Sequence, residues 1–203
     1  MKLPSRNECQ KIFNKYHTPV HIIKHSLAVN KVANYLAKKL VIAGCKINLD
    51  LVDRASLLHD TIRVADIKGD LFAYTDKSDE TKTNLLFWQK LQKKFHNQHH
   101  AEASYQIFKK QYLEMARVIK KHRLSAILRG ELKTWEEKIV YYADKRVDHD
   151  KFVSIKKRLS QGRKRWHSVP NTLDNQELLK QLTALEKQIF SAIKVKPQKI
   201  NDL

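Results

Sequence analysis

The sequence predicts an all-α protein, a bundle of helices followed by an accessory helix at its C-terminal end. Two observations predict this class. The 203 residues include only four glycines and four prolines, too few for the tight turns of a β-sandwich or β-barrel. Apolar residues instead recur at helical spacing, as in the stripe formed by Ile22, Ile23, Leu27, Val32, Tyr35, Leu36 and Leu40. A chain of this length buries a core without needing disulfides.

Capping residues mark the first three predicted helices. The first begins at the capping box Ser5-x-x-Glu8. The second has Thr18 as its N-cap and Pro19 as its first helical residue, and it ends at Gly44. Asn48 caps the third, which carries an apolar inner side up to Leu58.

The middle of the chain predicts a loop and then several helices. Residues 64–80 are polar and aperiodic, and they indicate a loop. A helix starting at Ser78 or Asp79 and reaching Phe95 follows, and then helices over 100–112 and 113–124. A second capping box, Thr134-x-x-Glu137, opens a helix whose basic continuation is predicted to reach about Arg165.

The C-terminal part predicts an accessory segment. Pro170 and residues 171–175 indicate a hinge, and residues 176–193 form an amphipathic helix that we expect to pack on or near the main domain. From Lys194 onward the chain is basic and predicted to fray. We therefore expect one domain over residues 1–166 and an accessory helix with a basic tail over residues 167–203.

Composition and charge limit the classes of function. The glycines are too scattered for a dinucleotide-binding or phosphate-binding loop. Cys9 and Cys45 form no CxxC pair, which argues against a thiolate zinc site and favours a cytoplasmic protein. No signal peptide and no membrane span are expected. The net charge of +19 favours polyanionic partners such as nucleotides or nucleic acid, or it serves only solubility.

Histidines and aspartates carry the strongest chemical pattern. His59 and Asp60 follow the apolar run that ends at Leu58. Burying such a carboxylate is costly unless a cation compensates it, and a metal ion would do so. Four further candidates stand on or beside other predicted helices: His25, His100, His122 and Asp144. His99 is the neighbour of His100, and His21 forms an HxxxH pair with His25, for which surface exposure is the simpler interpretation.

The order of these residues resembles the HD-domain superfamily of metal-dependent phosphohydrolases. The resemblance covers about residues 18–150 and extends to small stand-alone members with two additional histidines, including those that hydrolyse diadenosine tetraphosphate. The matching stretches are His25-Ser-Leu-Ala-Val, Leu57-Leu58-His59-Asp60, His100-Ala-Glu-Ala-Ser-Tyr, Ile119-Lys-Lys-His122 and Tyr142-Ala-Asp144-Lys-Arg. This resemblance implies an HD-like helical bundle as the fold.

The resemblance also implies a metal site. His25, His59, Asp60 and Asp144 match the family's core ligand set, while His100 and His122 match the pair that supports a second ion, with Asp60 bridging the two. One or two divalent ions are therefore expected. Imidazole and carboxylate ligands favour Mn, Fe, Co, Ni or Zn, and Mg also fits the family. A metal-bound hydroxide would then attack a phosphoester or phosphoanhydride.

Three cations near the motif are candidates for contacts with a phosphorylated substrate, which the resemblance implies to be a nucleotide or dinucleotide. Arg63 lies one turn after Asp60, and Lys145 and Arg146 follow Asp144. Arg63 and Lys145 would stabilise charge on the phosphoryl oxygens during catalysis, alongside Asp60, and Arg146 would help bind the substrate. A solvated surface position is the alternative for each cation.

Two other functions remain open at this stage. The basic runs 109–129 and 145–165 also suit a helical nucleic-acid-binding protein in which His59 and Asp60 are structural. The protein could alternatively be a catalytically degenerate HD protein that binds a partner. No oligomeric state follows from the sequence.

Overall fold

The computed structural model describes residues 1–72, 75–165 and 173–203, with side chains left undescribed over residues 162–175. The fold is all-α, as predicted, with one small hairpin in the described residues. The α-helices are α1 (Arg6–Lys15), α2 (Val20–Ile42), α3 (Leu49–Leu58), α4 (Lys82–Lys94), α5 (His100–Phe108), α6 (Leu113–Lys120), α7 (Leu124–Leu128), α8 (Trp135–Asp144), α9 (Ile155–Arg165) and α10 (Leu173–Ile193). The 3₁₀ helices are η1 (Arg63–Asp66), η2 (Lys77–Asp79) and η3 (Pro197–Asp202).

Most of the predicted helix ends are found where the capping residues place them. Both capping boxes form, at Ser5 before α1 and at Thr134 before α8. Asn48 accepts a hydrogen bond from the backbone of Leu51 and caps α3. Gly44 follows the end of α2 with a φ of +88°, a conformation that a residue without a Cβ adopts readily.

The predicted N-cap of α2 is wrong. Pro19, rather than Thr18, occupies the cap position, and α2 begins at Val20. The Thr18 hydroxyl donates a hydrogen bond to the backbone oxygen of Thr61, 2.8 Å away, instead of to its own helix. This bond ties the start of α2 to the chain just after α3.

Other predicted bounds also differ from the structure, including those of the helices predicted over 100–112 and 176–193, which are α5 (ending at Phe108) and α10 (beginning at Leu173). The helix predicted to start at residue 78 or 79 begins later, because Thr81 accepts a hydrogen bond from Asn84 and so caps α4. The helix predicted over 113–124 ends earlier, at Lys120, and a separate short helix, α7, begins at Leu124. The loop over 64–80 contains η1 and η2 in its described part.

A hairpin interrupts the long helix predicted from residue 134 to 165. After α8 the chain forms β1 (Val147–Asp148) and β2 (Lys151–Phe152), which pair antiparallel with Val147 opposite Phe152. His149 turns the chain with a φ of 54°. Only after this hairpin does the chain become helical again, in α9.

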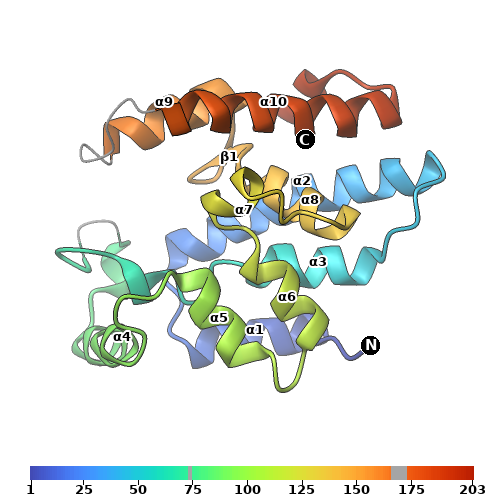
Figure 1. The fold of residues 1–203 in the computed structure, drawn as a ribbon. Coiled ribbons are helices and arrows are strands. Elements are labelled where there is room, and N and C mark those ends of the chain that lie inside the picture. Colours follow the sequence, from blue (N-terminus) through green and yellow to red (C-terminus); the bar gives the residue numbers. More distant parts are fainter. Residues whose placement is uncertain (73–74, 166–172) are drawn as a thin grey trace.

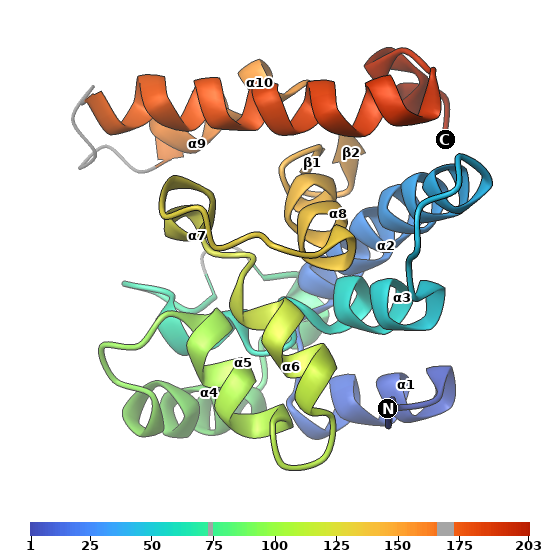
Figure 2. The ribbon, with the colours of Figure 1, turned by 45° about the vertical axis from the view of Figure 1, so that its right-hand side comes forward.

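The helices surround one main hydrophobic core. Helices α2, α3 and α8 lie at the centre of the molecule, with α10 along one side and α1, α4, α5 and α6 towards the other (Figure 1, Figure 2). Buried residues of α10, such as Leu182 and Ile189, belong to the same core as Leu36 of α2 and Leu58 of α3. A second, smaller cluster forms around Trp88 of α4.

The C-terminal segment packs on the rest of the chain. The predicted fraying from Lys194 onward is wrong, because η3 forms there and Ile200 is fully buried in the main core. The predicted boundary between residues 166 and 167 lies outside the described residues, as does the predicted hinge up to residue 172.

We find no helix, within the described ranges, that is long and apolar enough to cross a membrane.

Candidate metal centre

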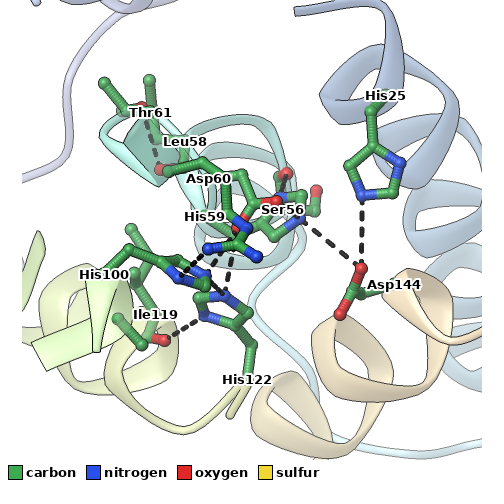
Figure 3. A network of polar contacts seen from close by, with 12 residues as sticks. His25, Ser56, Leu58, His59, Asp60, Thr61, His100, Ile119, His122 and Asp144 are labelled. Atoms are coloured by element: carbon green, nitrogen blue, oxygen red, sulfur yellow. Dashed lines mark hydrogen bonds and ion pairs between the residues drawn. The ribbon is translucent and has the colours of Figure 1, made fainter. Parts of the chain in front are cut away.

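The fold brings the six candidate ligands together in its interior. His25 lies on α2, His59 and Asp60 directly follow α3, and His100 is the first residue of α5. His122 lies just beyond α6, and Asp144 is the last residue of α8. All six side chains are buried. Figure 3 shows His25 and Asp144 facing each other on one side of His59 and Asp60, with His100 and His122 on the other side.

The first group consists of His25, His59 and Asp144. Oδ1 of Asp144 lies 3.2 Å from Nε2 of His25 and 3.8 Å from Nε2 of His59. One ligand atom from each residue lies within 4.8 Å of the other two. This spacing allows all three atoms to contact a single metal ion.

The second group consists of Asp60, His100 and His122. Oδ1 of Asp60 lies 3.0 Å from Nε2 of His100 and 3.2 Å from Nε2 of His122. The two imidazole nitrogens are themselves 2.9 Å apart. Oδ2 of Asp60 faces the first group, 3.7 Å from Nε2 of His59. The two groups therefore adjoin through the carboxylate of Asp60.

In each of the four histidines, the ring nitrogen Nδ1, which points away from the cluster, donates a hydrogen bond. Nδ1 of His59 donates to the backbone oxygen of Ser56 at 2.7 Å, and Nδ1 of His122 donates to that of Ile119 at 2.6 Å. Nδ1 of His25 donates to the backbone oxygen of His149 at 2.7 Å. Because these bonds occupy Nδ1, Nε2 of each ring faces the cluster and is the atom that a metal ion would contact.

His100 follows the same pattern with a different acceptor. Its Nδ1 donates to Oδ2 of Asp66 at 2.8 Å. Burial alone would raise the pKa of Asp66, but hydrogen bonds from His100 and the nearby charge of Arg63 lower it to about 2. Asp66 is absent from the sequence-based set of site residues because it lies in a segment that reads as a loop.

The structure contains an observation that fits a bound cation. Nε2 of His59 is buried and has no hydrogen-bond partner in the part of the chain that the structure describes. Burial lowers the pKa of His59 to about 4, so the ring is neutral and carries a lone pair towards the cluster. An unpaired buried nitrogen of this kind is costly in a protein interior, and coordination to a metal ion satisfies it.

The two aspartates of the cluster are ionised. Burial alone would raise the pKa of Asp144, yet Lys145 and His25 hold it well below its usual range. The pKa of Asp60 is likewise held low, against burial, by His59 and His100. Buried carboxylates and imidazoles together form the mixed donor set that first-row transition metals prefer.

Two of the predicted substrate-binding cations lie beside the cluster. Nζ of Lys145 pairs with Oδ2 of Asp144 and lies 3.3 Å from the backbone oxygen of His122. Arg63 pairs with Asp66 and has its Nη1 3.2 Å from Nδ1 of His100. Both cations are therefore positioned at the edges of the two groups.

The structure places Arg146 elsewhere, and this argues against its predicted role in substrate binding. The side chain is 2% exposed. Its guanidinium donates to the backbone oxygen of Val153 at 2.6 Å and to the hydroxyl of Tyr142 at 2.6 Å. Further bonds reach Glu186 of α10 and the backbone oxygen of Pro197. Arg146 holds the hairpin and the C-terminal segment against α8.

The other histidines next to the motif take different positions. His99 is exposed and caps α5 by accepting a hydrogen bond from the backbone of Ala101 at 3.1 Å. Its ring lies against that of His100 at a tilt of 32°, with ring centroids 4.1 Å apart. His99 can also form a metal-holding cluster with Asp66 and His100, whereas His21 joins no such cluster among the described residues.

A helical bundle with two adjoining buried His/Asp groups defines a class, the helical metalloproteins that can hold two ions side by side. The HD domain family matches residues 22–147, more than half of the chain, and the chain belongs to this family. HD domains are generally metal-dependent phosphohydrolases. The matched segment includes all six candidate ligands and ends before α9 and α10. Among the curated proteins and the solved structures, none matches the chain.

Proposed function

We propose that this protein is a phosphohydrolase that uses divalent metal ions to cleave a phosphoester or phosphoanhydride of a nucleotide or dinucleotide. One observation carries the proposal. Two groups of three ligand atoms adjoin in the protein interior, and the four histidines among them all bond through Nδ1 and direct Nε2 towards the cluster.

The ligand roles follow from the two groups. His25, His59 and Asp144 would hold one ion, and His100 and His122 would hold the other. Asp60 would bridge them, because its Oδ1 faces the second group and its Oδ2 faces His59. When bound, such ions lower the pKa of water and polarise a phosphoryl oxygen.

The protein's own side chains supply the contacts with phosphate. Lys145 lies beside the first group and Arg63 beside the second. We assign both cations to binding phosphoryl oxygens and to stabilising the negative charge that grows on them during cleavage. The net charge of +19 raises the local concentration of a polyanionic substrate. The assignment to nucleotides depends on the resemblance of the motif order to nucleotide-hydrolysing members of the family.

The substitution Asp60→Asn tests the proposal. It keeps the size of the side chain but removes the charge that would bridge the ions, so hydrolysis in the presence of Mn²⁺ should fall by about 100-fold or more. Purified protein is assayed on a panel of mononucleotides, dinucleoside polyphosphates and simple phosphoesters, with bound metal determined by elemental analysis.

Asp50→Asn is the matched control, because Asp50 is an exposed aspartate at the start of α3. It should hydrolyse the panel at the wild-type rate. The proposal fails if the wild type binds no divalent ion and hydrolyses nothing, or if Asp60→Asn is as active as the wild type. Salt-sensitive binding of RNA or DNA without hydrolysis would instead support a nucleic-acid-binding protein.

A further inference from the structure

Asp66 makes three contacts that bring it to the edge of the candidate metal centre. It is the last residue of η1 and lies six positions after Asp60. Its Oδ2 accepts hydrogen bonds from both the backbone nitrogen and the Nδ1 of His100, at 2.9 and 2.8 Å. Its Oδ1 pairs with Arg63. Asp66 therefore contacts a candidate ligand and a candidate phosphate-binding cation at once.

The two bonds to His100 constrain this residue at both ends. His100 is the first residue of α5, where backbone N–H groups lack partners within the helix. The carboxylate of Asp66 satisfies one of them and is favoured there by the helix dipole. Since the same oxygen also accepts from the ring, the backbone and the imidazole of His100 are oriented by one side chain.

His100 also differs from the other three histidines in the kind of acceptor it uses. His25, His59 and His122 donate to backbone carbonyl groups. His100 donates to a carboxylate. A carboxylate acceptor makes the opposite nitrogen a stronger electron donor than a neutral carbonyl does. The second group therefore depends on Asp66 in a way that the first group does not.

We propose that Asp66 is a positioning residue that selectively supports the second ion, the one held by Asp60, His100 and His122. It does so by orienting the ring of His100 and by keeping Arg63 next to it. This inference rests on the proposed function for the presence of two ions. It adds that the two ions have separable affinities and that one residue outside the ligand set controls only one of them.

The test is the titration of Mn²⁺ into the metal-free full-length protein by calorimetry. In Asp66→Asn the second equivalent should bind about 10-fold to 100-fold more weakly, while the first binds as in the wild type. Asp66→Glu keeps the charge and should recover part of the affinity for the second equivalent. In the visible absorption spectrum of Co²⁺-loaded Asp66→Asn, the band of the second ion should be lost or weakened, while the band of the first ion is retained.

Asp70→Asn is the control, because Asp70 is an exposed aspartate in the same segment. It should leave both affinities unchanged. Equal weakening of both equivalents, accompanied by a lower Tm of the metal-free protein, would make Asp66 merely structural and overturn the inference. It is also overturned if Asp66→Asn binds both ions as the wild type does, or if the wild type binds a third ion that the variant loses.

The result separates the two proposals. A wild type that binds two ions and hydrolyses nucleotides, with an Asp66→Asn variant of unchanged affinity, overturns only the role of Asp66. A wild type that binds no ion overturns both.

Discussion

Arg146 shows how one buried side chain joins parts of the protein that are distant in sequence. Its guanidinium bonds to Tyr142 on α8, to the backbone at Val153 after the hairpin and to the backbone at Pro197, the first residue of η3. Glu186 of α10 supplies a nearby negative charge. Hydrogen bonds from a charged donor contribute more than neutral ones, and removing the donor leaves several buried acceptors unsatisfied.

Arg146→Met should therefore reduce stability rather than chemistry. We expect the free energy of unfolding to fall by about 2–3 kcal/mol, measured by urea denaturation of the metal-free protein. The folded fraction should retain kcat/KM. Arg129→Met, at an exposed arginine, should change the stability by no more than about 0.5 kcal/mol. A selective loss of kcat/KM in Arg146→Met without a loss of stability would instead support the predicted role of Arg146 in substrate binding.

The residues that the sequence identified are those whose chemistry alone makes them unusual. A His-Asp pair after an apolar run suggests a metal site, and the order of the other histidines and Asp144, which resembles the HD-domain superfamily, completes the candidate ligand set. Asp66 carries no such signal, because its importance comes from the turn that brings η1 against the first residue of α5. Lys145 and Arg146 could not be distinguished either, since their directions depend on the hairpin that follows them.

At the scale of the elements, the C-terminal ends of helices orient two of the candidate ligands. His59 and His122 each donate to the backbone oxygen three residues earlier, in the last turn of α3 and α6. Such carbonyl groups lack partners within the helix. A histidine placed just after a helix thus satisfies the helix end and has its own ring oriented by the same bond.

Capping residues also explain which elements were predictable. Ser5, Asn48 and Thr134 act within three residues, so a local pattern was sufficient to place α1, α3 and α8. The hairpin was missed because its strands have two residues each, too short for an alternating pattern. His149 also stands at the turn where glycine or asparagine would be the usual signal.

His149 offers a test of this hairpin. Its φ of 54° is unfavourable for a β-branched residue, and its backbone oxygen accepts the hydrogen bond from His25. His149→Val should destabilise the protein by about 1–2 kcal/mol and should weaken metal binding by the first group. His149→Gly adopts the same φ without strain and keeps the carbonyl, so it should be more stable than His149→Val and bind the first ion more tightly. Thermal unfolding and Mn²⁺ titration of the two variants test this expectation. Equal Tm values and equal Mn²⁺ affinities of His149→Val and His149→Gly would contradict it.

At the scale of the whole molecule, the candidate ligands come from α2, α5, α8 and the chain segments after α3 and α6. They span residues 25 to 144, so ions held by them would connect most of the HD domain. Helix α10 supplies none of the six and instead covers the core with residues such as Leu182 and Ile189. Bound ions would thus stabilise from the inside the same bundle that α10 covers from one side.

Divalent ions should therefore stabilise the folded protein as a whole. Ions that bind only the folded state add about 2.7 kcal/mol when their free concentration is one hundred times their Kd. For a chain of this length that corresponds to a rise in Tm of about 5–10 °C. Calorimetric scans with Mn²⁺ and after chelation should differ by this amount in the wild type and in Asp50→Asn. The shift should be much smaller in His59→Ala, which removes the ligand nitrogen that lacks a partner in the described structure. An equal shift in His59→Ala would mean that the ions bind elsewhere on the protein.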